Sequence, residues 1–253
     1  MEEIIKQNLE EIERMENVKI LYATESGSRM WGFASPDSDY DVRFIYVHPV
    51  EFYLKLEKTS DVIEWKLDEV LDINGWDLQK MLRLLHTSNP TLFEWASSPL
   101  VYKITPEWER IRGVVNDYFI SKTSMYHYLS MAKRHISVYL ETPEVSLKKY
   151  FYGIRPVLAC KWIAEKGTPP PVLFSELMES ELDDEFKPLI NDLLRRKTDT
   201  SESGKIPRID ELNAYIKSEI ERTESLINSL PKDQKSGFEE LDKIFTDIVL
   251  NNR

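Results

Sequence analysis

The fold is decided by residues 27–41, which read GSRMWGFASPDSDYD and lie between two apolar runs. The first run covers residues 18–24, and the second extends from Tyr40 to Val47. Both are rich in β-branched and aromatic residues, so each predicts a β-strand. The glycines and the Ser-Pro-Asp-Ser sequence between them predict turns. The chain is therefore expected to leave one strand, turn at Gly27 and enter a second strand near Asp39.

Two aspartates, Asp39 and Asp41, stand one residue apart at the start of the second strand. Side chains alternate between the faces of a strand, so these two are expected to point the same way. Carboxylates held this close repel each other unless a cation lies between them. Mg²⁺ binds oxygen ligands and leaves positions for phosphate, and two such ions (or Mn²⁺) suit an in-line phosphoryl displacement. The preceding Gly27-Ser28 pair predicts a phosphate-binding turn.

A third metal-binding carboxylate is expected from a neighbouring strand, and Asp72 is the first choice. It stands between strand-forming apolar residues. Asp77 and Glu64 remain alternatives, although Asp77 is better explained as the N-cap of a helix. Asp39, Asp41 and Asp72 are thus the predicted catalytic and metal-binding residues.

Two other metal- or phosphate-binding motifs, the EF-hand loop and the Walker-type loop, do not match the sequence. Asp37, Asp39 and Asp41 have the spacing of an EF-hand loop, but Val42 stands where that loop requires glycine, and His48 where it requires glutamate. The sequence also has no Walker-type phosphate loop. A plain Asx-turn at this point stays open as an interpretation.

The rest of the chain predicts an α+β protein with a small mixed sheet followed by helices. A catalytic domain over residues 1–106 and a helical domain over residues 107–253 are expected. Residues 198–206 are the best candidate for a mobile loop. Further elements are expected as a helix over 2–15, strands over 60–66 and 68–73, a helix opened by Gly75-Trp76-Asp77 with Leu78, Met81, Leu82 and Leu85 on its apolar face, a short helix over 90–96, and helices over 107–119, 122–140, 145–165, 172–180, 183–197, 208–229 and 234–250.

Composition narrows the class of protein. The 253 residues carry a net charge of −11, which disfavours a general nucleic-acid-binding protein. Residues 121–166 are different, with 8 basic and 3 acidic side chains and a net charge of +5, so a local anion site is expected there. Cys160 is the only cysteine, which excludes an internal disulfide. No signal peptide or membrane span is visible, so a cytoplasmic protein is expected.

The basic segment contains a possible ligand-binding helix face. Lys148, Tyr152 and Arg155 are spaced i, i+4 and i+7, so they share one face. Such a face could hold a triphosphate or an RNA backbone, and the neighbouring tyrosines could stack a base. The alternative is that the lysines are solvated and the tyrosines lie at the edge of a core. Pro156 is expected to kink this helix or to start a new one.

Several of these strings resemble one family. Gly27-Ser28, ten residues and then Asp39-Tyr40-Asp41-Val42 match the signature of the DNA polymerase β-like nucleotidyltransferase superfamily. The longer strings 27–46, 71–78, 89–95 and 148–156 resemble the branch of predicted nucleotidyltransferases associated with RNA ligases. The resemblance spans roughly residues 18–175. It implies a mixed sheet with flanking helices, Mg²⁺ bound by Asp39 and Asp41, and Asp72 as the third acid.

The sequence and the resemblance together predict transfer of a nucleoside monophosphate from an NTP, with ATP favoured, to an acceptor hydroxyl. An RNA end is the favoured acceptor, and a protein side chain is the second. A non-catalytic nucleotide-sensing or antitoxin-like module is the alternative from another class. The expected nucleotide-binding residues are Gly27, Ser28, Arg29, Lys148, Tyr152 and Arg155.

Overall fold

The computed structural model describes residues 1–57, 59–68, 70–199, 204–230 and 236–252. The chain forms two compact units. The sheet unit consists of Met1–Met30, Asp39–Tyr118 and Lys235–Arg253, and the helical unit consists of Trp31–Ser38 and Phe119–Gln234. Each unit is therefore built from segments distant in sequence. The expected domain boundary at residue 107 stays a prediction. It would place Lys235–Arg253 in the helical domain, whereas this segment belongs to the sheet unit.

A five-stranded mixed sheet forms the centre of the sheet unit, with the strand order β3-β4-β2-β1-β5. β2 pairs in parallel with β4, and every other neighbouring pair is antiparallel. The mixed sheet confirms the predicted α+β class. The strands are β1 (Lys19–Glu25), β2 (Tyr40–Val47), β3 (Val62–Leu67), β4 (Leu71–Asp77) and β5 (Val101–Ile104).

β4 corrects one sequence-based expectation. Gly75 and Trp76 were expected to open a helix, but they belong to the strand, which ends at Asp77. The parallel pairing with β2 continues as far as Tyr46 opposite Asp77. A side chain on Gly75 would overlap the ring of Phe44, so glycine lets the two strands pair closely here. Long-range pairing therefore extends the strand beyond its local signal.

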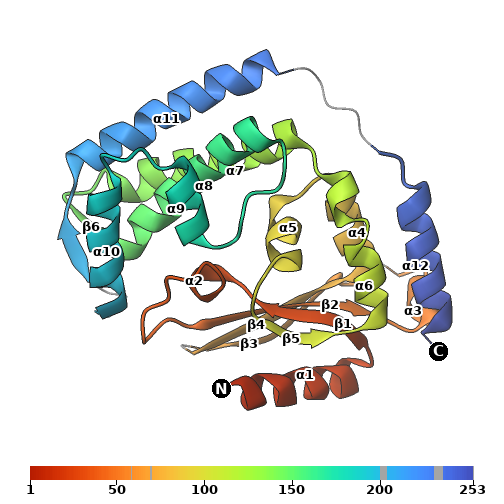
Figure 1. The fold of residues 1–253 in the computed structure, drawn as a ribbon. Helices are drawn as coiled ribbons and strands as arrows, with labels where there is room; N and C mark the ends of the chain where they lie inside the picture. The colour runs from red at the N-terminus through yellow and green to blue at the C-terminus, as the bar shows by residue number, and fades with distance from the viewer. Residues whose placement is uncertain (58, 69, 200–203, 231–235, 253) are drawn as a thin grey trace. The chain divides into compact units, whose positions relative to one another are not determined.

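Helices cover the two faces of the sheet (Figure 1). Helix α1 (Glu2–Glu16) lies along one face, where Ile5, Leu9 and Ile12 join the apolar cluster of β1, β2 and β4. α4 (Leu78–His86), α5 (Pro90–Ala96) and α6 (Pro106–Arg112) lie on the opposite side. The predicted apolar face of α4 is confirmed, because the four residues predicted for it, Leu78, Met81, Leu82 and Leu85, are all buried.

Shorter elements and the C-terminal helix complete the sheet unit. They are α3 (Val50–Tyr53), the 3₁₀ turn η1 (Val115–Tyr118) and α12 (Glu239–Asn251). The helix expected over 107–119 is split, because α6 ends before Gly113 and the chain continues as η1. The Tyr53 and Phe245 rings meet edge to face at 5.2 Å, which packs α12 against α3.

The helical unit is built around α8 (Leu147–Lys166), which packs on α7, α9 and α11. α8 passes through Pro156 as one continuous helix, so no new helix starts there, and the expected kink stays a prediction. The proline removes one backbone donor, but the residues on both sides of it are buried and hold the helix. The other elements are α7 (Ser121–His135), the π turn η2 (Ile136–Leu140), β6 (Glu144–Ser146), α9 (Phe174–Glu181), α10 (Lys187–Asp199), β7 (Lys205–Pro207) and α11 (Asp210–Ser229).

A short antiparallel ladder joins β6 and β7 in the helical unit. It was not expected, because three-residue strands carry almost no periodic signal. Part of the predicted mobile loop, residues 200–203, lies outside the described residues, and its last two residues belong to β7. None of the helices described has the length and apolar character needed to cross a membrane.

Candidate functional site

The turn after β1 is shaped for glycine. Ser26 donates its backbone N–H to the carbonyl of Asp41 at 2.8 Å, so the turn is tied to the start of β2. Gly27 has φ of 61° and opens the one-turn helix α2 (Gly27–Met30). A Cβ at this position would overlap Oδ2 of Asp41. Backbone angle and space therefore both require glycine, and the turn lies directly against the Asp41 carboxylate.

Asp41 and Asp72 are brought side by side by the sheet. They are register partners on the parallel strands β2 and β4. Their side chains are 21% and 24% exposed, so both carboxylates can be reached by solvent. The sequence predicted a neighbouring strand as the source of a third acid, and the structure places Asp72 at this position.

Arg43 links the two carboxylates. Its Nη2 donates to Oδ1 of Asp41 at 3.0 Å and to Oδ2 of Asp72 at 2.6 Å. Its Nη1 donates to the carbonyls of Val42 and Asp72. The guanidinium thus balances two like charges that would otherwise repel each other. Sequence reasoning missed this residue, although its place two residues after Asp41 puts it on the same strand face.

Glu25 supports the site from the end of β1. It is fully buried there, and its carboxylate accepts hydrogen bonds from the backbone N–H of Asp41 at 2.7 Å and from the Tyr102 hydroxyl. Burial raises the pKa of the Glu25 carboxyl, and the two hydrogen bonds oppose that shift. Glu25 therefore positions the backbone of Asp41. It was also missed from sequence, because β5, which carries Tyr102, was not predicted.

Asp39 and Arg29 lie at the entrance to β2. The Asp39 side chain is exposed, and its carbonyl accepts a hydrogen bond from Nε of Arg29 at 3.0 Å. The Arg29 guanidinium lies 3.7 Å from the centre of the Tyr40 ring. Ser28, by contrast, is buried with 4% exposure. The structure therefore brings the predicted residues of the sheet unit to one strand end, with Ser28 turned inward.

The alternatives to Asp72 have other surroundings. Asp77 is 3% exposed and caps α4, accepting hydrogen bonds from the backbone N–H of Gln79 at 2.8 Å and the Tyr53 hydroxyl at 2.7 Å. This confirms the predicted N-cap. Glu64 is exposed on β3, opposite Asn74. Of the three candidates, Asp72 is the one in register with Asp41.

The predicted residues on α8 lie within the helical unit. Arg155 is only 1% exposed, and its guanidinium packs 4.4 Å from the centre of the Trp31 ring. Tyr152 meets the same ring edge to face at 5.0 Å, and Lys148, one turn earlier, is half-buried. The helical spacing predicted a shared face that could bind a triphosphate or RNA. Arg155 lies inside instead, because the segment Trp31–Ser38 packs within this unit.

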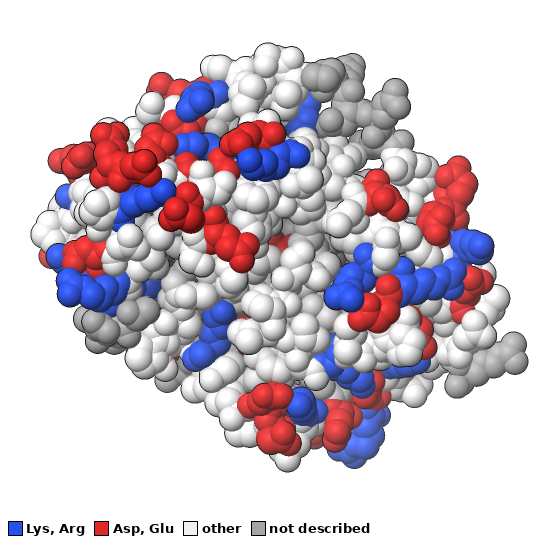
Figure 2. All heavy atoms as spheres, in the orientation of Figure 1, with Lys and Arg blue, Asp and Glu red and all other residues white. Residues whose placement is uncertain are grey.

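Much of the basic segment is paired within the helical unit. Lys133 bonds Glu224 at 2.8 Å and Lys166 bonds Glu165 at 2.5 Å. The Lys149 ammonium lies 3.7 Å from the centre of the Tyr139 ring. On the face drawn in Figure 2, basic and acidic side chains lie next to one another. A net charge of +5 along the sequence therefore does not by itself make a basic patch.

The donors at the sheet edge fit a hard divalent cation by their chemistry. Asp39, Asp41 and Asp72 offer only carboxylate oxygens, which Mg²⁺ and Mn²⁺ prefer. The Arg43 guanidinium shows that two of them already share one positive charge. Across the described ranges, no three His, Cys, Asp or Glu side chains are arranged as a metal site.

Comparisons with known proteins identify the family. A profile of the RNA repair pathway DNA polymerase beta family matches residues 1–247. The uncharacterized protein YcgL of Bacillus subtilis is 44% identical over 251 residues, which cover 98% of this chain and 96% of that protein. A crystal structure of a nucleotidyltransferase-like protein from Exiguobacterium sibiricum aligns with 97% of this chain and 87% of its own, at 15% identity and a TM-score of 0.34. The resemblance carried by the motifs is thus confirmed, and the chain belongs to the RNA repair pathway DNA polymerase beta family.

Proposed function

We propose that this protein is a nucleotidyltransferase that transfers a nucleoside monophosphate from an NTP to an acceptor hydroxyl and releases pyrophosphate. One observation carries the proposal: Asp41 and Asp72 stand in register on parallel strands, and Asp41 lies directly against a turn where only glycine fits. This arrangement joins an acidic pair to a backbone that a phosphate can approach closely. Membership in a polymerase beta family supports the same reaction class.

Asp39, Asp41 and Asp72 would hold Mg²⁺, with Mn²⁺ as the substitute. When bound, the metal supplies positive charge that stabilises the phosphate oxygens in the transition state. Glu25 contributes by fixing the Asp41 backbone through a 2.7 Å hydrogen bond. Arg43 contributes by holding Asp41 and Asp72 together, which keeps both carboxylates turned toward the same space. The acidic site is in this way pre-organised by the chain itself.

The Gly27 turn would hold the β- and γ-phosphates with its backbone amides, and Arg29 would add charge beside it. The acceptor oxygen then bonds the α-phosphorus as the bond from that phosphorus to the bridging oxygen breaks. Pyrophosphate leaves, and the acceptor proton passes to Asp72. ATP is the proposed donor. Lys148, Tyr152 and Arg155 stay candidates for nucleotide or acceptor binding from the helical unit.

An RNA end is the proposed acceptor. The name of the family, which places it in RNA repair, supports this choice. A protein side chain would react by the same chemistry, since any suitably placed hydroxyl can attack. The two acceptors are distinguished by which product becomes labelled when the α-phosphate of the NTP carries the label.

The experiment incubates the protein with each of four α-phosphate-labelled NTPs, with Mg²⁺ or EDTA, and with RNAs that differ in their ends. We expect label in RNA that requires Mg²⁺ and disappears in Asp41→Asn and Asp72→Asn. Glu64→Gln, an exposed acid on the same sheet, is the matched control and should retain activity. Label in the protein instead of RNA would identify a protein side chain as the acceptor. Transfer by Asp41→Asn at the wild-type rate would overturn the mechanism, and no transfer in any arm would favour a non-catalytic module.

A further inference from the structure

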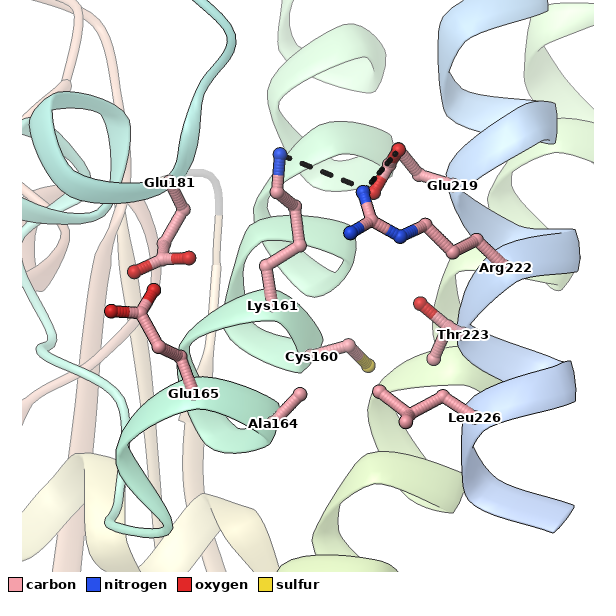
Figure 3. Close-up of a pocket in the computed structure, with 9 residues that line it drawn as sticks. All are labelled: Cys160, Lys161, Ala164, Glu165, Glu181, Glu219, Arg222, Thr223 and Leu226. Carbon is pink, nitrogen blue, oxygen red and sulfur yellow. Dashed lines mark ion pairs between the residues drawn. The ribbon is translucent and has the colours of Figure 1, made fainter. Parts of the chain in front are cut away.

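The helical unit contains a cavity of about 270 Å³ that the proposed reaction does not use. It opens between α8 and α11, with the end of α9 at its side (Figure 3). Glu165 and Arg222 are exposed at its mouth, whereas Glu181 and Glu219 are buried within it. The remaining walls come from Cys160, Lys161, Ala164, Thr223 and Leu226.

Glu219 is a buried carboxylate with incomplete partners. It is 6% exposed, and its Oε2 accepts no hydrogen bond from the residues that the structure describes. Its two ion pairs are long, at 4.0 Å to Nζ of Lys161 and 3.6 Å to Nη1 of Arg222. Lys161 is engaged elsewhere, since it bonds Asp183 at 2.7 Å. Glu219 therefore presents an oxygen to the cavity that lacks the donor a buried carboxylate needs.

Glu181 is the second buried acid of this lining. It is 5% exposed and accepts a 2.7 Å hydrogen bond from the neutral hydroxyl of Ser180. No Lys or Arg of the described ranges lies within ion-pair distance of it. In Figure 3 its carboxyl group points toward that of Glu165. A buried carboxylate without close partners is costly, so the open Oε2 of Glu219, with a second buried acid in the same lining, points to a cation as the ligand.

The shape and lining indicate the kind of cation. An ammonium group offers three donors and one positive charge, which matches the open Oε2 of Glu219 and the carboxylate of Glu181. Ala164 and Leu226 provide apolar surface for a short carbon chain. A metal ion is disfavoured, because no group of potential ligands in the described part of the chain is arranged to hold one. An anion is disfavoured because carboxylates outnumber the basic side chains of this lining.

We propose that this cavity binds a small aliphatic amine, with Glu219 and Glu181 accepting hydrogen bonds from its ammonium groups. The cavity lining shares no residue with the proposed nucleotidyl-transfer site, so binding can be tested without a catalytic assay. The full chain is titrated with putrescine, a short diamine, by calorimetry. Butanediol is the matched ligand control, because it has the same chain length without the charge. We expect saturable binding of the diamine and none of the diol.

Variants of the acids locate the site. We expect Glu181→Gln and Glu219→Gln each to weaken putrescine binding by roughly tenfold or more, since each removes a charge-assisted hydrogen bond. Glu221→Gln, an exposed acid on the same helix as Glu219, should bind as the wild type does. Ala164→Phe, at an exposed position of α8, should block the cavity without touching either acid.

Thermal unfolding separates binding from folding. Without ligand, the two glutamine variants should be at least as stable as the wild type, because each loses a poorly compensated charge. Putrescine should raise the melting temperature of the wild type and of Glu221→Gln, and leave that of Ala164→Phe unchanged. No saturable binding by the wild type up to about 10 mM, a weak affinity limit, would overturn the proposal. Unchanged affinity in both Glu219→Gln and Ala164→Phe would do so as well.

Discussion

The two units each contain a pair of acids, and the pairs are compensated differently. In the sheet unit, Asp41 and Asp72 share the Arg43 guanidinium at 3.0 and 2.6 Å. In the helical unit, the Glu219 ion pairs are 4.0 and 3.6 Å long. The first pair is also more exposed, at 21% and 24%, whereas Glu219 is 6% exposed. Acids that share a close cation can stay side by side in the unligated protein, whereas the two buried glutamates are the acids for which we propose a cation from outside.

The largest effect should follow from Gly27→Ala, which attacks the first acid pair directly. The new Cβ would overlap Oδ2 of Asp41 at a residue with φ of 61°. We expect the free energy of unfolding to fall by about 2–3 kcal/mol and transfer to fall by about 100-fold, because the carboxylate must move.

Gly167→Ala is the matched control for this change. Gly167 has φ of 66°, but no atom lies within 4 Å of the position that its Cβ would take. It should lose only about 1 kcal/mol, from backbone strain alone, and keep its transfer activity. Denaturant unfolding and labelled-NTP assays measure both variants. Equal losses of stability and activity in the two would contradict the proposed overlap.

Arg43→Met should give the next largest effect, because it makes the first acid pair resemble the second. Asp41 and Asp72 would remain adjacent without their shared cation. We expect the free energy of unfolding in EDTA to fall by about 2 kcal/mol. Mg²⁺ should restore more stability to this variant than to the wild type, because the metal replaces the missing charge.

Arg110→Met is the control, since it removes an exposed ion pair with Asp247. It should cost about 0.5 kcal/mol or less, with no added response to Mg²⁺. A metal response of the same size in both variants would show that the Mg²⁺ effect does not come from the aspartate pair.

Glu219→Gln should have a smaller effect of the opposite sign. Because the carboxylate lacks close partners, its removal is expected to leave the free energy of unfolding unchanged or raise it by up to about 1 kcal/mol. Asp72→Asn, which breaks a close ion pair, should lower it by about 1 kcal/mol. Denaturant unfolding of both variants in the same buffer tests the difference, and a shared sign would remove the contrast between the two units.

His48 should affect stability only as the pH falls, and it tests the cost of charging a partly buried group in the sheet unit. Burial lowers the pKa of His48 to about 4 from 6.5, and the charge of Lys55 adds to the shift. Between these two values the unfolded chain binds more protons, so the free energy of unfolding falls as the pH falls. We expect His48→Phe to remove about 1 kcal/mol of that decline between about pH 7 and 5.

Phenylalanine is chosen because the His48 ring stacks on Phe52 at 3.5 Å, and the replacement keeps an aromatic ring there. His127→Phe, at an exposed position, should leave the decline unchanged. The pH dependence of denaturant unfolding measures both variants. An undiminished decline in His48→Phe would assign the pH dependence to other groups.

The sequence alone determined the local features of the sheet unit. The strand over Tyr40–Val47 has the predicted bounds. The strand before Gly27 was predicted over residues 18–24 and covers Lys19–Glu25. The Asp77 cap and the apolar face of α4 are also confirmed. Each of these rests on residues within one or two turns of each other, where side-chain period and capping chemistry act directly. The family followed from the same short motifs.

Only the tertiary structure decided which of these features meet. The parallel register sets Asp72, and neither Asp77 nor Glu64, opposite Asp41. It also gives Arg43 its role between the two carboxylates. Such pairing joins residues about thirty positions apart, and its free energy depends on the whole sheet, so no local pattern encodes it. For the same reason, the sequence did not predict that Glu181 and Glu219 line one cavity, because this depends on the packing of α9 and α11 against α8.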